Sequence, residues 1–284
     1  MRRGDIMTKI RLPYGLRENA LLHISQVDSG LACGCVCPRC SSPLVARKAT
    51  RREHHFAHHA SDSCRYATET ALHLAAKDIL DRLRVIRLPA VRIEFKSNRS
   101  AHEIAPAQMY EIDSVRIEQR VDGLVPDLIA RIGNRDLFIE VYVTHPVDSN
   151  KLQRIRDLRV SAVEIDLSDA PRDMPMDAIA ELVVNGIDNK RWIFNAREQA
   201  EYKRLMSQTL RKPTIRRGLA VHVDWCPIAV RVWRGKPYAN VNDDCASCEH
   251  CLEAGSNYIQ CNGHLSTLVP HRPRRPQSLE QVDG

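Results

Sequence analysis

The chain has 284 residues, of which 43% are hydrophobic and 27% are charged, and its net charge is +7. These proportions are ordinary for globular proteins and exclude a disordered chain, a collagen or a coiled coil. No run of about 18 apolar residues is present, which excludes a transmembrane helix. No apolar segment follows the charged start, so we expect no signal peptide and a cytoplasmic protein.

The charge is distributed unevenly along the chain. Residues 1–60 carry a net charge of +6, residues 121–190 carry −5, and residues 191–220 carry +6. A metal-dependent enzyme that acts on a polyanion needs such a pattern, because carboxylates hold cations and arginines hold phosphates. Ordinary variation of surface charge is the alternative interpretation.

Hydrophobic periodicity and turn residues predict an alternation of helices and strands. The predicted elements are a helix at 69–84, strands at 91–95, 111–119, 125–132 and 136–144, a helix from 148 or 149 to 159, a strand at 162–167, and a helix at 175–185. A Gly133-Asn134 turn joins the third and fourth strands into a hairpin. This order predicts an α/β fold with a mixed sheet flanked by helices.

Four segments are expected along the chain. They are an N-terminal Cys/His module at 1–65, the α/β core at 66–190, a third segment at 191–265 and a disordered tail at 266–284. The third segment contains a basic helix at 195–212 and a Cys-rich zinc module at 221–265.

The first group of candidate metal ligands surrounds Cys37-Pro-Arg-Cys40. Two thiolates on one tight turn suit tetrahedral Zn²⁺, and a second pair further along the chain completes the site. We expect Cys37, Cys40, His58 and Cys64 as ligands, with His55 as the alternate third ligand. Cys33 and Cys35 are left over, and the alternative is a reduced CxxC turn beside surface histidines.

The second group surrounds Cys245-Ala-Ser-Cys248. We expect a closed structural Zn²⁺ site made by Cys226, Cys245, Cys248 and Cys261. Further candidates complicate the choice, namely His250, Cys251 and His264. A buried thiol without metal is the alternative for Cys226. With ten cysteines in a chain without a secretion signal, metal binding is favoured over disulfides.

Two acidic residues lie on the predicted hairpin. Asp127 follows Pro126, and Glu140 lies in the middle of the apolar strand DLFIEVYVT, on the same side as Tyr142. A carboxylate at such a position costs free energy to bury unless it meets a cation. Together the two carboxylates can bind a divalent metal, although an exposed turn acid and an edge-strand glutamate would give the same pattern.

The preceding helix carries Glu69, His73 and Lys77 at intervals of four residues, which places them on one polar stripe. A solvated face with salt bridges is the simple interpretation of this stripe.

The motifs CxCPRCSSPLVARKA, HHFAHHASDSC, ETALHLAAK, VPDL and IEVYVTH occur in this order over residues 20–170. In order and spacing they resemble the competence protein CoiA-like family, a nuclease-like branch of the PD-(D/E)xK superfamily. The resemblance implies a restriction-endonuclease-like core with a zinc-finger-like N-terminal module, acting on DNA in uptake, recombination or repair. Asp127 and Glu140 match the family's metal-binding acids, and Glu69 matches its helix acid. Tyr142 stands where the family has lysine, and Lys151 or Lys77 is the expected replacement.

We therefore expect a nuclease that hydrolyses phosphodiester bonds with Mg²⁺ or Mn²⁺ bound by Asp127 and Glu140. Tyr142 is a poor general base, because its ordinary pKa is near 10. Six arginines are expected to contact the DNA backbone: Arg191, Arg197, Arg204, Arg211, Arg216 and Arg217. The alternative is a catalytically inactive nuclease fold that binds DNA or acts as an adaptor; a zinc-bound scaffold without nucleic acid is a third hypothesis.

Overall fold

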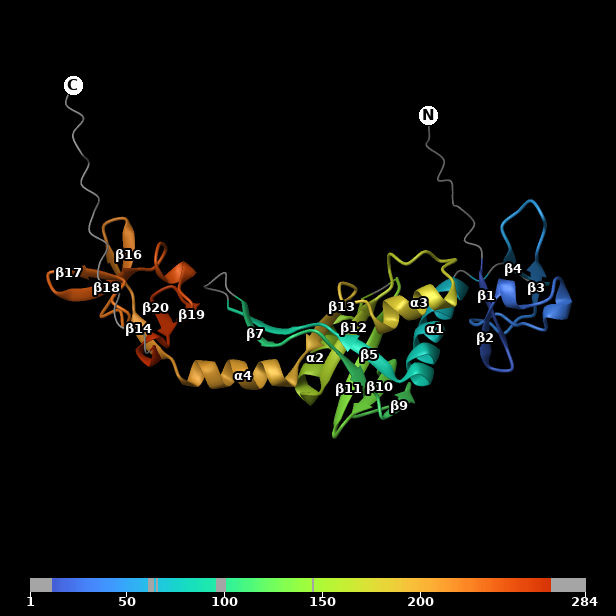
Figure 1. Ribbon diagram of the computed structural model, residues 1–284, viewed down its shortest axis with the longest axis horizontal. Helices are drawn as coiled ribbons and strands as arrows, with labels where there is room; N and C mark the ends of the chain where they lie inside the picture. Colours follow the sequence, from blue (N-terminus) through green and yellow to red (C-terminus); the bar gives the residue numbers. More distant parts are fainter. Residues whose placement is uncertain (1–11, 61–63, 65, 96–100, 145, 267–284) are drawn as a thin grey trace, which may run out of the picture. The chain divides into compact units, whose positions relative to one another are not determined.

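The computed structural model describes residues 12–60, 64, 66–95, 101–144 and 146–266. The chain divides into two compact units. The first unit contains residues 1–89 and 107–196, and the second contains residues 90–106 and 197–284. The described helices and strands give a mixed α/β protein (Figure 1). No helix in the described segments is long and apolar enough to cross a membrane.

The first unit contains a five-stranded mixed sheet in the order β13-β12-β11-β10-β9. Its strands are β9 (Ser114–Ile117), β10 (Leu128–Ile132), β11 (Arg135–Tyr142), β12 (Ser161–Asp166) and β13 (Lys190–Phe194). Neighbouring strands are antiparallel except β11 and β12, which are parallel. A parallel pair needs a crossover connection, and α2 (Ser149–Leu158) provides it.

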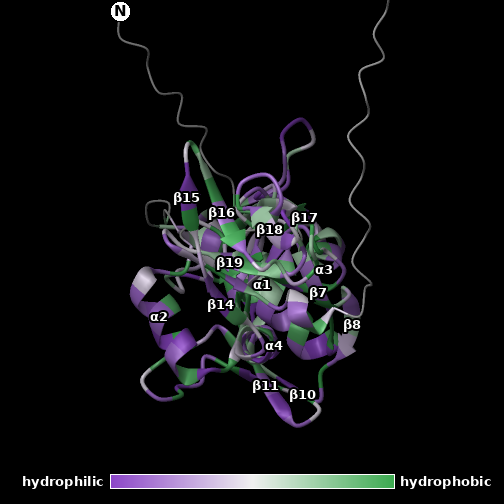
Figure 2. Cartoon of the chain, turned by 90° about the vertical axis from the view of Figure 1, so that its left-hand side faces the viewer, coloured by the Kyte–Doolittle hydropathy of each residue, from purple (hydrophilic) through white to green (hydrophobic). Residues whose placement is uncertain are grey.

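Helices cover both faces of this sheet (Figure 1). On one face, α1 (Ala67–Leu83) and α3 (Met176–Val184) pack on the sheet through a cluster that includes Leu72, Ile139 and Ile179. On the other face, Ile155 of α2 packs with Phe138 and Ala162. The remainder of α2 is largely hydrophilic (Figure 2), as expected for a helix with one buried stripe.

Two short hairpins precede α1 and have their own small core. They are formed by β1 (Tyr14–Arg17) with β2 (Ala20–His23), and by β3 (Leu44–Arg47) with β4 (His55–His58); η1 (Ile24–Gln26) and η2 (Leu31–Cys33) lie between them. Tyr14 is fully buried and donates a hydrogen bond to the carbonyl of Met174, which ties the first hairpin to the α/β core. After α1, β5 (Val85–Leu88) pairs with β8 (Gln108–Glu111).

The second unit combines the β6–β7 hairpin, α4 and two small sheets. The hairpin is β6 (Val91–Glu94) with β7 (Ala101–Ala105), and the helices are α4 (Ala196–Ser207) and the short η3 (Cys245–Ser247) and η4 (Gly263–Leu265). The first sheet has the strand order β14 (Leu210–Pro213), β20 (Tyr258–Cys261), β19 (Cys251–Ala254). The second sheet has the order β15 (Ile215–Arg217), β16 (Ala220–Asp224), β18 (Lys236–Asn240), β17 (Arg231–Trp233). Ile93 and Phe95 pack with Leu205 and Leu252.

Several predicted elements differ from those observed. The strand expected at 91–95 is β6, which belongs to the second unit and not to the core, because its apolar side chains pack with Leu205. The strand expected at 111–119 is divided into β8 and β9, since the amide of Ile112 bonds to the carbonyl of Arg84. The basic helix expected to reach residue 212 ends at Ser207, and β14 follows because its residues pair with β20. The predicted disordered tail lies, from residue 267 onward, outside the described residues.

Candidate active site and metal centres

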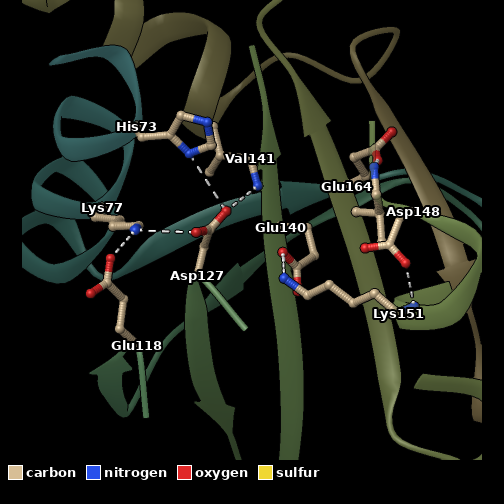
Figure 3. A network of polar contacts seen from close by, with 10 residues as sticks. His73, Lys77, Glu118, Asp127, Glu140, Val141, Asp148, Lys151 and Glu164 are labelled. Atoms are coloured by element: carbon tan, nitrogen blue, oxygen red, sulfur yellow. Dashed lines mark hydrogen bonds and ion pairs between the residues drawn. The ribbon is translucent and has the colours of Figure 1, made fainter. Parts of the chain in front are cut away.

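Asp127 lies immediately before β10, and its carboxylate contacts both α1 and the neighbouring strand (Figure 3). Its Oδ2 accepts a hydrogen bond of 2.9 Å from the amide of Val141, and Oδ1 lies 3.1 Å from Nζ of Lys77. His73 lies on the same helix, with Nδ1 3.6 Å from Oδ2. Burial raises the pKa of Asp127, but His73, Lys77 and the Val141 amide outweigh it and hold the pKa well below its usual range. Asp127 is therefore ionised at neutral pH.

Two carboxylates explain why Lys77 can be buried on α1. It is only 5% exposed, and its ammonium also donates a hydrogen bond of 2.7 Å to Glu118, at the end of β9. Burial lowers the pKa of Lys77, but the two carboxylates outweigh this effect and raise it. Lys77 thus remains charged and neutralises Asp127.

Glu140 is 3% exposed and lies in the middle of β11. Its Oε2 accepts a hydrogen bond of 2.6 Å from Nζ of Lys151, whereas its Oε1 is buried and has no hydrogen-bond partner among the described residues. Burial raises the pKa of Glu140 to about 7, against the opposing effect of Lys151, and the charge of Asp127 contributes to the increase. Asp127 and Glu140 therefore interact electrostatically and differ strongly in acidity.

The start of α2 determines where Lys151 lies. Asp148 caps the helix by accepting hydrogen bonds of 2.9 Å from the amides of Asn150 and Lys151. This cap fixes Lys151 in the first turn, from which its side chain extends to Glu140 (Figure 3). Tyr142, two residues after Glu140, is half-buried and forms no hydrogen bond with either carboxylate among the described residues.

Glu164 is a third buried acid and was not among the predicted site residues. It pairs with Glu140 in the parallel register of β11 and β12, is 1% exposed, and accepts a hydrogen bond of 2.6 Å from Nε of Arg191. The sequence contains a signal for it, because Glu164 interrupts an apolar strand just as Glu140 does. Arg191, which was predicted to contact DNA, therefore pairs with a buried acid.

Glu69 lies one turn before His73 on α1 and forms no hydrogen bond or ion pair with the other residues of the candidate site among the described residues. It lines an open depression of about 380 Å³ together with Arg39, Tyr66, Thr70 and His73. His73 therefore borders both this depression and the Asp127 carboxylate. Arg39 comes from the CxxC turn, so the N-terminal hairpins contribute a cation beside the acidic site.

The unpaired Oε1 of Glu140 is relevant to whether this site could bind a divalent cation. A buried carboxylate oxygen without a partner is costly, and hard oxygen ligands are those that Mg²⁺ prefers. The low pKa of Asp127 supplies a second carboxylate that is already ionised. Both residues supply oxygen atoms of the type that Mg²⁺ or Mn²⁺ prefers, and Glu140 would have to lose its proton before it could bind either ion.

Three predicted zinc ligands come together in the N-terminal hairpins. The ligand atoms of Cys37, Cys40 and His58 all lie within 4.8 Å of one another, and Nε2 of His58 is 3.3 Å from Sγ of Cys40. A hydrogen bond with Ser42 is the main cause that lowers the pKa of Cys40 to about 6, so its thiolate is available at neutral pH. This group can hold a zinc ion.

The other N-terminal candidates lie outside this group of three. Cys64 packs against the small core, and Nδ1 of His55 contacts the carbonyl of Glu53. Cys33 and Cys35 are buried, and their thiols donate to the carbonyls of Leu44 and Cys33.

The four predicted ligands of the second zinc site lie around one small cavity in the second unit, and Cys251 joins them. His250 and His264, the alternative ligands, do not line it.

The predicted DNA-contacting arginines fall into both units. Arg191 belongs to the first unit, whereas Arg197, Arg204, Arg211, Arg216 and Arg217 belong to the second. Arg204 is paired with Glu201, Arg217 is paired with Asp224, and Arg211 lies 4.0 Å over the ring of Tyr258. The arginines therefore differ in how free their charge is to meet a phosphate.

Comparisons with known proteins do not show a family for this chain. No protein-family model matches the chain, and no curated protein or solved structure is significantly similar to it.

Proposed function

We propose that this protein is a metal-dependent nuclease with a restriction-endonuclease-like core. The observation that carries the proposal is the juxtaposition of Asp127 and Glu140 on neighbouring strands, with a buried, unpartnered oxygen on Glu140 and the Lys151 ammonium 2.6 Å from its other oxygen. These are the two acids and the cation that phosphodiester hydrolysis requires. The order of α1, Asp127, Glu140 and α2 along the chain supports the same assignment.

The residues have separate roles in this proposal. A divalent cation held by Asp127 and Glu140 would polarise the scissile phosphate and lower the pKa of the attacking water. Lys151 would orient that water or offset negative charge that develops on the phosphate. His73 and Lys77 hold the Asp127 carboxylate in place, and Tyr142 contributes positioning at most.

DNA is the proposed substrate because the chain carries groups of basic residues as well as the acidic site. Arg39 borders the depression next to His73, and the arginines of the second unit add sequence-independent phosphate contacts. All ten cysteines are free, which suits a reducing compartment, and we place the protein in the cytoplasm. Recombination or DNA-processing proteins are its proposed partners.

The N-terminal hairpins are proposed to hold one structural zinc ion. Cys37, Cys40 and His58 supply three ligands, and Cys64 is the proposed fourth, since it packs against the same small core. A core of so few residues needs such a cross-link to be stable.

A catalytically inactive, DNA-binding nuclease fold is the second candidate function. It is favoured by one observation: each acid already has its own cation, with Lys77 on Asp127, Lys151 on Glu140 and Arg191 on Glu164. A metal would have to compete with these cationic side chains.

The test is cleavage of labelled single-stranded, duplex and branched DNA, and of RNA, by the full chain with Mg²⁺, with Mn²⁺ or with EDTA. A nuclease cleaves at least one form only when metal is present, and Asp127→Asn abolishes this activity. Binding without cleavage under every condition would favour the inactive fold instead.

A further inference from the structure

One side of the sheet β15-β16-β18-β17 faces a small core of the second unit, and the other side faces away from it. Val223 of β16 and Ala239 of β18 are 1% and 2% exposed and belong to that core. Successive side chains of a strand point to opposite sides, so the neighbours of these two residues point away from the core. The strand register places on this outer face, among others, Arg217, His222, Asp224, Trp233, Lys236 and Tyr238.

Three aromatic side chains follow one another across the outer face. Trp233 is 63% exposed, so most of its indole meets solvent. Tyr238 and His222 are half-buried, and the centres of their rings lie 5.6 Å apart. Trp233 is opposite Lys236 in the β17–β18 hairpin, which makes Tyr238, two residues further on, its diagonal neighbour. The aromatic row therefore runs over three adjacent strands.

The turn of the β17–β18 hairpin presents the exposed tryptophan. Its two central residues, Arg234 and Gly235, have φ angles of 48° and 76°, and the type I′ turn of two-residue hairpins requires positive φ at both. The guanidinium carbon of Arg234 lies 4.7 Å from the centre of the Trp233 ring, in a cation–π contact with one face of the indole. Because Trp233 remains 63% exposed, the other face of its ring is open to a planar group.

The segment that contains this sheet is strongly basic. Residues 210–240 include seven lysines and arginines but a single acidic residue, Asp224. Asp224 is paired with Arg217 at 2.7 Å, and Arg231 is paired at 2.7 Å with Asp244 from the following segment. The other five cations form no salt bridge within the described part of the chain. Their positive charge is therefore available to a polyanion.

Lys236 and Arg234 are two of these unpaired cations, and both flank Trp233. Lys236 lies opposite Trp233 on the neighbouring strand, and Arg234 follows it in the chain. A nucleic acid without base pairs is complementary to this arrangement, because its phosphates meet the cations while its base faces meet the rings. A duplex is not, because its base faces are stacked on one another and only base edges reach the grooves.

We propose that the outer face of this sheet binds single-stranded nucleic acid, with an unpaired base stacked on Trp233 and the adjoining phosphates held by Lys236 and Arg234. The row that continues through Tyr238 offers further ring faces to adjacent bases. Such stacking accepts any sequence, since every base has a π face. The proposal extends the proposed function, on which it rests for the class of ligand, by naming the form of nucleic acid that the second unit binds.

Equilibrium binding of labelled oligonucleotides to the full chain in EDTA tests this proposal without any metal-dependent cleavage. The probes are a single strand of about 20 nucleotides without self-complementarity, longer than the roughly 4–16 nucleotides of known single-strand sites, and the duplex of equal length. We expect Trp233→Ala to weaken single-strand binding by about 5- to 150-fold, the range for one lost base–aromatic stack. Duplex binding should fall by less than about twofold, because the phosphate contacts remain.

Two further variants separate stacking from other effects, and all three substitutions are at exposed positions outside the core. Trp233→Phe keeps a ring at this position and should retain single-strand affinity within about threefold. Val232→Ala is the matched control and should change neither affinity, because Val232 is the preceding residue of β17, is 46% exposed and points to the opposite side of the sheet. The single strand should also quench the fluorescence of the chain's three tryptophans, and less so in Trp233→Phe.

The outcomes distinguish this proposal from the nuclease assignment. Unchanged single-strand binding by Trp233→Ala, or equal weakening of single-strand and duplex binding, would overturn the stacking platform. Selective weakening of single-strand binding, in a protein that cleaves nothing with any metal, would refute the nuclease and support the platform.

Discussion

The ammonium group of Lys151 lies 2.6 Å from the buried carboxylate of Glu140, although the two residues come from a helix and a strand. A lysine at position 142 would reach the same region from β11 itself, two residues after Glu140 and on the same side of the strand. Helix α2 brings a cation to the acid from a different element. Lys151 therefore supplies a positive charge beside Glu140 although position 142 is a tyrosine.

We expect Lys151→Ala to lower the cleavage rate by about 10²–10⁴, the range for a positioned group that assists proton transfer. DNA affinity should change little, because one cation near the acids adds little to many phosphate contacts. Single-turnover cleavage and equilibrium DNA binding, measured on the same preparation, separate the two effects.

Tyr142 provides the control for Lys151. Tyr142→Phe should retain most of the activity. The double change Lys151→Ala with Tyr142→Lys should recover part of the activity lost in Lys151→Ala, because it places a lysine on the strand beside Glu140. Cleavage at the native rate by Lys151→Ala would show that this lysine only balances the charge of Glu140.

Asp127→Ala and Glu140→Ala should each abolish cleavage, and the double variant should be no slower than either single one. Residues that bind one metal act as a unit, so their effects are not additive. Zinc content should be unchanged, because Cys37, Cys40 and His58 contact neither acid. If both single variants cleave at the native rate, the active site lies elsewhere in the chain.

The raised pKa of Glu140 predicts a pH-dependent stability. Between about pH 4.5 and pH 7 the folded state holds the proton of Glu140 while the unfolded chain has released it, so the free energy of unfolding falls as the pH rises through this window. Glu140→Gln removes this fall. Relative to the native protein, the variant should gain up to about 3 kcal/mol between pH 5 and pH 8 in urea unfolding without divalent metal.

Glu164→Gln is a control for this pH effect, because its acid is also buried on the neighbouring strand but is bonded to Arg191. Saturating Mg²⁺ should reduce the stability loss of the native protein above pH 7, since a bound cation favours the ionised carboxylate. A stability difference that is the same at pH 5 and pH 8 would contradict the raised pKa.

The sequence predicted the core elements that combine periodicity with local end signals. The Asp148 cap, the Gly133-Asn134 turn and the apolar stripe of α1 act over a few residues, and the helices and the hairpin agree with them within about three residues. Strands β7 and β13 were not predicted, and β6 was predicted as a strand but assigned to the core. Their positions depend on pairing and packing with residues far along the chain.

In the candidate site, too, features set by local sequence could be predicted and contacts between distant residues could not. The sequence predicted that Asp127 and Glu140 lie on paired strands, from acids beside or within apolar segments, and it placed Lys151 on the next helix. The contacts of Glu118 with Lys77 and of Arg191 with Glu164 join residues that lie 41 and 27 positions apart. Only the folded sheet brings such residues together, so no local pattern predicts these pairs.

Removing the N-terminal metal should unfold the hairpins that precede α1. We expect Cys37→Ser and His58→Ala each to lose one equivalent of zinc and to expose Phe56 and Leu44 of the small core. His55→Ala is the matched control, because His55 lies three residues away on the same strand and contacts the Glu53 carbonyl instead. Elemental analysis and limited proteolysis measure the two effects; equal zinc loss in both histidine variants would assign His55 as a ligand.

The arginines of the second unit should set the salt dependence of DNA binding. Changing Arg211, Arg216 and Arg217 together to Ala should reduce the slope of log affinity against log salt by about two, at roughly 0.7–0.9 for each phosphate contact, because Asp224 already neutralises Arg217. All DNA sequences should be weakened alike, since backbone contacts carry no base information. Arg204→Ala is the comparison, because two hydrogen bonds to Glu201 already neutralise this guanidinium, and its slope should change by less than about one. An unchanged slope in the triple variant would move the DNA surface to the first unit, where Arg39 borders the acidic site.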